Sequence, residues 1–239
     1  MSGVIPSAAR DLLDGHRTSI EQIPQSLRSF GMTGFVELRA HTAFSFGDGA
    51  MTPEALAARA AALGYPAVGV TDAADLGGIP RLVAAAAKAG IRPIAGAEIE
   101  VDGRPLAFLV QSREGYRNLA ALVTRARVAD LGSWTREAPH VPRGRPGVRW
   151  ADVAERSEGL HLLTGPGTGR LAALVREGAA GAAARELARW REAFGGRIAV
   201  EVQRHQAGRH EAALADALAD LAGHEGVPWV VTQIGRAHV

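Results

Sequence analysis

The chain has 239 residues, enough for one substantial core, and its lack of cysteine excludes disulfide frameworks and thiolate metal sites. Its formal net charge is +2, and only Lys88 among 27 basic residues is a lysine, with no compact basic block to indicate nucleic-acid binding. No apolar run approaches the ~20 residues of a membrane helix and no secretory signal opens the chain, which predicts a cytoplasmic protein.

Residues 1–33 show no clear periodicity, and we predict a disordered leader or a misassigned start outside the domain. From residue 34 onward, short β-like runs alternate with helical patterns, which is typical of βα units on a mainly parallel sheet. Seven strands are predicted, over residues 35–38, 67–70, 93–101, 105–110, 160–164, 197–202 and 228–232. Because no glycine-rich phosphate-binding fingerprint follows the first run, a closed or nearly closed βα barrel fits better than a doubly wound sheet.

Helical spacing separates these runs. Thr52 can cap a helix with Pro53 in its first turn, and Gly64 ends it. Residues 132–149 hold three prolines and three glycines without a helical period, so we predict a long surface loop. Residues 233–239 look like the translation of a sequencing adapter, and we expect the natural sequence to stop near Thr232, which leaves 34–232 as the domain.

Several polar side chains follow predicted strands. Arg39 and His41 lie two apart after the first strand, Asp72 follows the second, and Glu98 belongs to the third. Glu201 and His205 follow the sixth. Because strand ends converge on one face of a βα barrel, this mixture of histidine and carboxylate suits a divalent cation site.

A family resemblance rests on four stretches: residues 35–101, "REGYRNLAALVTRAR" at 113–127, "GLHLLTG" at 159–165, and "VEVQRH" at 200–205. They resemble the opening of the bacterial DNA polymerase III alpha family, which is a polymerase-and-histidinol-phosphatase (PHP) domain. The resemblance implies a distorted seven-stranded βα barrel, here truncated at its C-terminal end. The long segment before Trp150 and the sequence around "FSFGDGA" favour the error-prone, translesion branch.

In active members of that family the same motifs build a trinuclear metal centre, and this chain departs from them. Arg39 replaces the first histidine of His-x-His, and Ala73 replaces the histidine of Thr-Asp-His. Pro105 and Pro166 stand where a further histidine and a cysteine are expected. The resemblance leaves four vestigial metal candidates, which are His41, Asp72, Glu98 and His205.

An arginine is permanently cationic and has no lone pair to donate, so Arg39 puts a positive charge where a metal would lie. We therefore expect Arg39 to pair with Asp72 or Glu98 and to replace the ion electrostatically. Each candidate also has a structural interpretation: His41 as an ordinary barrel-mouth histidine, Asp72 as the cap of the following helix, and His205 as surface.

The resemblance implies an amino-terminal fragment of a DNA-directed DNA polymerase that acts in replication or translesion repair synthesis. The fragment lacks the polymerase palm, and we expect it to be structural and poor in metal, although residual zinc or manganese stays open. For the parent, the resemblance implies magnesium, DNA, contact with the polymerase body, and a sliding clamp or translesion accessory protein. The alternatives are a metal-dependent phosphoesterase or 3'-5' exonuclease of the PHP superfamily, and a pure binding module.

Overall fold

The computed structural model describes residues 35–131, 146–203 and 209–232. Within them the strands are β1 Glu37–Ala40, β2 Ala67–Ala73, β3 Arg92–Val101, β4 Arg104–Val110, β5 Gly147–Val148, β6 Leu160–Leu163, β7 Ile198–Gln203 and β8 Trp229–Thr232. The helices are α3 Pro53–Ala62, α4 Ile79–Ala89, α5 Arg113–Leu131, α6 Trp150–Ala154, α7 Arg170–Arg176, α8 Ala180–Phe194 and α9 Arg209–His224. All seven predicted runs form strands, and β5 is an additional short strand in the segment predicted to be a loop.

The strands form a nearly closed barrel in the order β1-β2-β3-β4-β6-β7-β8, with β5 paired to β3. Neighbours are parallel except at β4, which runs antiparallel to both β3 and β6. The turn between β3 and β4 explains this direction, because Asp102 and Gly103 have φ angles of 50° and 77°. Two successive positive φ angles are typical of a tight hairpin turn, which joins antiparallel strands.

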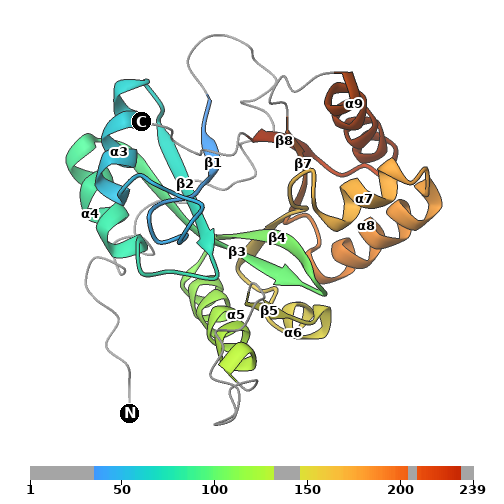
Figure 1. Cartoon of the computed structure of the whole chain (residues 1–239), viewed down its shortest axis with the longest axis horizontal. Helices are drawn as coiled ribbons and strands as arrows, with labels where there is room; N and C mark the ends of the chain where they lie inside the picture. Colours follow the sequence, from blue (N-terminus) through green and yellow to red (C-terminus); the bar gives the residue numbers. More distant parts are fainter. Residues whose placement is uncertain (1–34, 132–145, 204–208, 233–239) are drawn as a thin grey trace.

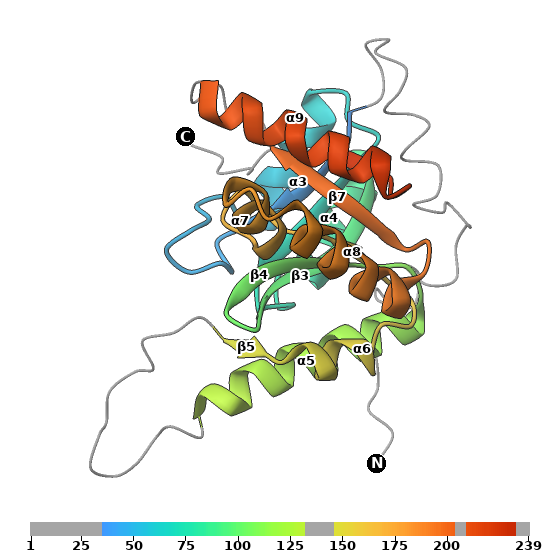
Figure 2. The ribbon, with the colours of Figure 1, turned by 90° about the vertical axis from the view of Figure 1, so that its right-hand side faces the viewer.

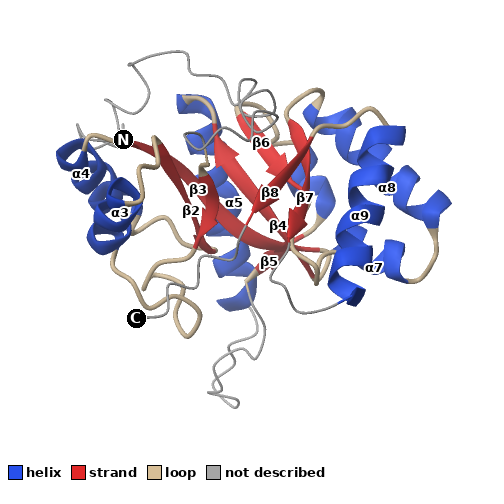
Figure 3. Ribbon diagram, turned by 90° about the horizontal axis from the view of Figure 1, so that it is seen from above, coloured by secondary structure: helices blue, strands red, loops and turns tan. Residues whose placement is uncertain are grey.

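Helices cover the barrel on separate sides. α3 and α4 lie beside β1 and β2, whereas α7, α8 and α9 lie at the opposite end of the sheet (Figures 1 and 3). α5 runs beneath β3 and β4 (Figure 2). The predicted cap of α3 is present, because Thr52 Oγ1 accepts a hydrogen bond from the Ala55 amide at 3.3 Å. Among the described residues, no helix combines the length and apolar character that crossing a bilayer requires.

The alternation of side chains along a strand carries two acidic residues into the barrel. Ala97 and Ile99 of β3, and Val200 and Val202 of β7, belong to the apolar core shared with α5, α8 and α9. Because successive strand residues point to opposite faces, Glu98 and Glu201 point away from that core. Both carboxylates are therefore buried inside the barrel.

Gly115, in the first turn of α5, lies against the backbone of the turn that precedes β6. A methyl group at this position would collide with the carbonyl group of Gly159, which also accepts a hydrogen bond from the Gln111 amide. We expect Gly115→Ala to lower the free energy of unfolding by at least about 2 kcal/mol in chemical denaturation. The control is Gly223→Ala in α9, where the added methyl group meets no atom within 4 Å. Equal stability of the two variants would contradict this packing.

His161 of β6 gives the fold a pH dependence. Burial lowers the pKa of His161 to about 4, and the positive charge of Arg197 acts in the same direction. The unfolded chain binds this proton near pH 6.5, so it holds more protons than the folded chain between these values, and stability falls as the pH decreases from 6.5 towards 4. In unfolding experiments across this window, His161→Leu should lose less stability than the wild type. An identical pH profile of the two proteins would contradict the assignment.

Candidate functional site

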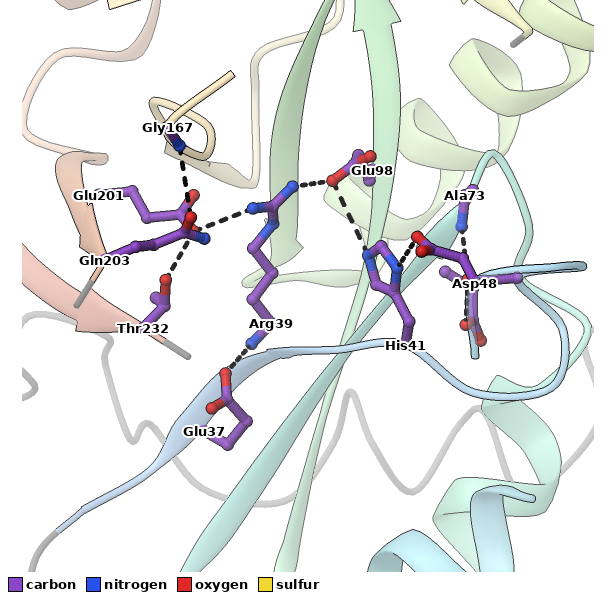
Figure 4. Close-up of polar contacts among 12 residues, drawn as sticks. Glu37, Arg39, His41, Asp48, Ala73, Glu98, Gly167, Glu201, Gln203 and Thr232 are labelled. Atoms are coloured by element: carbon purple, nitrogen blue, oxygen red, sulfur yellow. Dashed lines mark hydrogen bonds and ion pairs between the residues drawn. The ribbon is translucent and has the colours of Figure 1, made fainter. Parts of the chain in front are cut away.

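Arg39 is the centre of the barrel mouth, at the end of β1. Its side chain is 3% exposed, and the guanidinium lies between two carboxylates from different strands (Figure 4). Nη1 donates to Glu201 Oε1 at 3.1 Å, and Nη2 forms an ion pair with Glu98 Oε2. The backbone amide of Arg39 donates to Glu37 Oε1 at 2.8 Å. One cation thus connects β1 with β3 and β7.

One carboxylate oxygen of Glu201 accepts hydrogen bonds from side chains of three strands. Besides Arg39, its Oε1 atom accepts hydrogen bonds from Gln203 Nε2 at 2.7 Å and from Thr232 Oγ1 at 2.6 Å. Its backbone amide donates to Thr164 Oγ1 at 3.0 Å. The carboxylate therefore ties β1, β7 and β8 together at the place where no ladder joins the described residues of β1 and β8.

His41 occupies the other side of the guanidinium. Its Nδ1 atom is 2.9 Å from Asp48 Oδ2, and its Nε2 atom is 3.8 Å from Glu98 Oε2. Burial lowers the pKa of His41 below its usual value, the hydrogen bond to Asp48 opposes this shift, and the charge of Arg39 adds to it. A neutral imidazole that donates from Nδ1 to Asp48 presents Nε2 as an acceptor.

Asp72 has a different role from Glu98. Its Oδ1 atom accepts hydrogen bonds from the Thr42 amide and Ser45 Oγ, both at 2.6 Å, and its Oδ2 atom accepts one from Thr42 Oγ1 at 2.7 Å. The side chain is 1% exposed and holds the loop that follows β1. The capping interpretation was wrong, because α4 begins after Gly78 and has no side-chain cap. Of the two partners expected for Arg39, the structure pairs it with Glu98.

Arg39, His41, Glu98 and Glu201 line a cavity at the barrel mouth with a volume of about 380 Å³, and other predicted positions lie in or beside it. Pro105 and Pro166 line it, whereas Ala73 only donates its amide to Ser45 Oγ at 3.0 Å. His205 lies outside the described residues. The sequence analysis placed Glu201 among the polar side chains at strand ends but not among the four metal candidates, and it did not single out Asp48. The Gly-Asp-Gly turn was the available signal for Asp48.

A di- or trinuclear metal centre does not fit the side chains at this mouth. Within residues 35–131, 146–203 and 209–232, no three histidine, aspartate or glutamate side chains are grouped to hold a metal ion. One oxygen of Glu98 and one of Glu201 are bound to a guanidinium, which is a donor only. Proline rings at 105 and 166 supply no ligand atoms. No hydrolytic step through paired metal ions follows from this arrangement.

Residues 37–205 match the family model of the PHP domain. The DNA polymerase III subunit alpha of Caulobacter vibrioides is 36% identical over 211 residues, which cover 83% of this chain and 18% of the relative. The error-prone DNA polymerase of Anaeromyxobacter dehalogenans is 38% identical over 211 residues, covering 85% and 17%. The chain thus spans less than a fifth of the length of these curated relatives.

Among solved structures, an amidohydrolase from Chromobacterium violaceum with bound sulfate and no metal has a TM-score of 0.57 at 21% identity. The match covers 83% of this chain and 86% of that one, and it supports the fold alone. Fold and mouth together define an α/β barrel whose polar centre is built on an arginine. The chain belongs to the PHP domain family and is homologous to part of DNA polymerase III alpha subunits and error-prone DNA polymerases.

The Arg39 ion pairs predict a large loss of stability when the guanidinium is removed. Arg39→Met leaves two buried carboxylates without their cation, and we expect the free energy of unfolding to fall by about 3–5 kcal/mol. The stability of Arg39→Lys should lie between that of the wild type and that of Arg39→Met, because lysine keeps the positive charge but lacks the planar guanidinium. The measurement is urea denaturation of purified variants.

The matched control is Arg81→Met, which breaks an exposed arginine–glutamate pair. Arg81 Nε lies 2.6 Å from Glu54 Oε1 on the surface between α3 and α4. Exposed pairs contribute little to stability, so this variant should unfold close to the wild type. Equal losses from Arg39→Met and Arg81→Met would contradict a special role of the buried pair.

Proposed function

We propose that this chain is the PHP domain of a DNA polymerase of the DNA polymerase III alpha family, of the error-prone branch, and that it serves there as a structural domain. The observation that carries this proposal is the Arg39 guanidinium between Glu98 and Glu201. The identity to two polymerases over most of the chain supports the parentage. In such a parent, DNA synthesis in replication or translesion repair, with its magnesium and DNA, belongs to other parts of the protein.

The proposed structural role follows from what a guanidinium can and cannot do. Like a metal ion, Arg39 compensates the negative charge of buried carboxylates, which are costly to leave without a partner. Unlike a metal ion, it has no open coordination position, so it cannot polarise a phosphoryl oxygen as a Lewis acid or generate a metal-bound hydroxide. We therefore interpret Arg39, with His41, Asp72, Glu98 and His205, as a former metal site in which an ion pair replaces the metal.

The proposed partner is the polymerase body of the same parent chain, with residues 34–232 as the domain that packs on it. Relatives of this chain are several times longer, which supports a role as one part of a larger protein. A sliding clamp or a translesion accessory protein is the proposed second partner, and the cytoplasm is the proposed location.

Metal content tests the proposal directly. We expect the chain, purified after expression with added zinc and manganese, to hold far less than one metal ion per molecule by mass spectrometry. It should also leave phosphate monoesters and diesters intact. Stoichiometric metal, together with phosphoester hydrolysis that Glu98→Gln abolishes, would overturn the structural role and favour the phosphoesterase or exonuclease alternative.

A further inference from the structure

The loop between β1 and α3, residues 41–52, carries the most exposed large apolar side chain among the described residues. Phe46 is 102% exposed, whereas the other exposed large apolar side chains have values between 46% and 58%. Phe44, two residues earlier, is half-buried, and the guanidinium of Arg81 lies 5.8 Å from the centre of its ring. The loop extends away from the strands, in blue in Figure 2. It therefore packs one aromatic ring on the domain and presents the other to solvent.

Hydrogen bonds on both sides of Phe46 hold the loop in this conformation. Before it, Ser45 Oγ donates to Asp72 Oδ1 at 2.6 Å. After it, Asp48 Oδ2 lies 2.9 Å from His41 Nδ1 (Figure 4), and the Asp48 amide donates to the Ser45 carbonyl at 2.9 Å. An aromatic ring on a loop that is already ordered loses little conformational entropy when a partner covers it, and such rings are common anchors of protein interfaces.

The surroundings of Phe46 favour a protein partner over nucleic acid. Stacking on single-stranded nucleic acid is combined with a cationic groove for the phosphates, but residues 41–52 contain neither lysine nor arginine. The neighbouring Arg81 donates from Nε and Nη2 to the two oxygens of Glu54. Asp48, the acidic residue of the loop, is engaged by the imidazole described above. An uncharged aromatic tip of this kind fits an apolar pocket on a protein.

The position of the loop indicates which protein segment lies nearby. The loop follows the end of β1, and its Asp48 lines the mouth cavity together with Glu201. Thr232, the last residue of β8, donates to Glu201 Oε1 at 2.6 Å, so the described chain leaves the barrel at the same mouth. In the proposed parent the polymerase body follows this domain and is much the larger part, since the relative from Caulobacter vibrioides matches over 18% of its length. That body therefore continues from the face that carries the loop.

We propose that Phe46 anchors this domain to the polymerase body of the same parent chain, with its ring inserted into an apolar pocket of that body. This inference rests on the proposed function and adds to it the contact surface and the chemistry of the partner. The pocket must be free of unpaired charge, because a charge buried against an uncharged ring would lose its water without gaining a partner. The rest of the loop contributes an uncharged border, with exposed Ala43, Gly47 and Ala50.

Photo-crosslinking in the full-length parent tests the contact, with p-benzoylphenylalanine in place of Phe46. We expect crosslinks from position 46 to residues of the polymerase body in the same molecule, identified by mass spectrometry. The control carries the same amino acid in place of Leu63, which is 49% exposed and precedes β2, at the end of the barrel away from the mouth. It should give at least about tenfold fewer of these crosslinks, because only a covered side chain reacts efficiently with a partner.

Three results of this experiment would overturn the proposal. The first is equal crosslinking from positions 46 and 63. The second is crosslinking of position 46 to an added primer–template, which would assign the ring to DNA. The third is crosslinking between two copies of the chain, which would make the loop a dimer contact.

The variant Phe46→Ser separates docking from folding. Because the ring is exposed, urea denaturation of the 239-residue chain should give the same midpoint for the variant and the wild type. Amide hydrogen exchange of residues 43–51 should be at least about tenfold slower in the parent than in the 239-residue chain. Phe46→Ser should remove this difference, whereas Leu63→Ser should preserve it.

Failure of this inference and failure of the proposed function give different results. Exchange in the parent that Phe46→Ser leaves unchanged would overturn the anchor and leave the proposed function standing. A parent gene without a polymerase body would overturn the proposed function and the anchor together.

Discussion

The ion pairs of Arg39 are the interaction on which the barrel mouth depends. Two carboxylates lie inside the barrel because strand alternation places Glu98 and Glu201 opposite the apolar faces of β3 and β7. Burying two negative charges without a cation would cost several kcal/mol for each, by order of magnitude. The guanidinium of Arg39, which β1 carries, offsets that cost. The two carboxylates therefore stay compensated only while β1 keeps its position in the barrel.

The geometry of the fold explains why this bridge is needed at this place. β1 and β8 are the two ends of the hydrogen-bonded strand order, so within the part of the chain that the structure describes no backbone ladder joins them. Glu201 accepts from Arg39 on β1 and from Thr232 on β8, which provides a side-chain connection across the missing ladder. Asp72 does separate work, since its three short hydrogen bonds hold Thr42 and Ser45 in the loop beside the mouth.

The sequence predicted the strands well because a buried strand leaves a continuous apolar run. It missed β5, since two residues such as Gly147 and Val148 have no measurable period, and their pairing with β3 depends on tertiary contact. The Asp-Gly pair at residues 102 and 103 is typical of a hairpin turn, and the βα interpretation did not use it. Arg39 pairing with Glu98 was one of two expected outcomes, because charge alone does not distinguish Glu98 from Asp72. The contacts of Glu201 required the curvature of the barrel, which no local pattern contains.

Replacing a metal ion by an arginine has a geometric consequence. A metal ion can bind several ligand atoms around one centre, whereas a guanidinium directs a planar set of N–H groups, and here it reaches one oxygen of each carboxylate. One guanidinium thus pairs with both carboxylates, while one oxygen of Glu201 accepts no hydrogen bond from the described residues. Glu201 Oε2 is the atom where this difference remains, because it is buried and accepts no hydrogen bond from any residue that the structure describes.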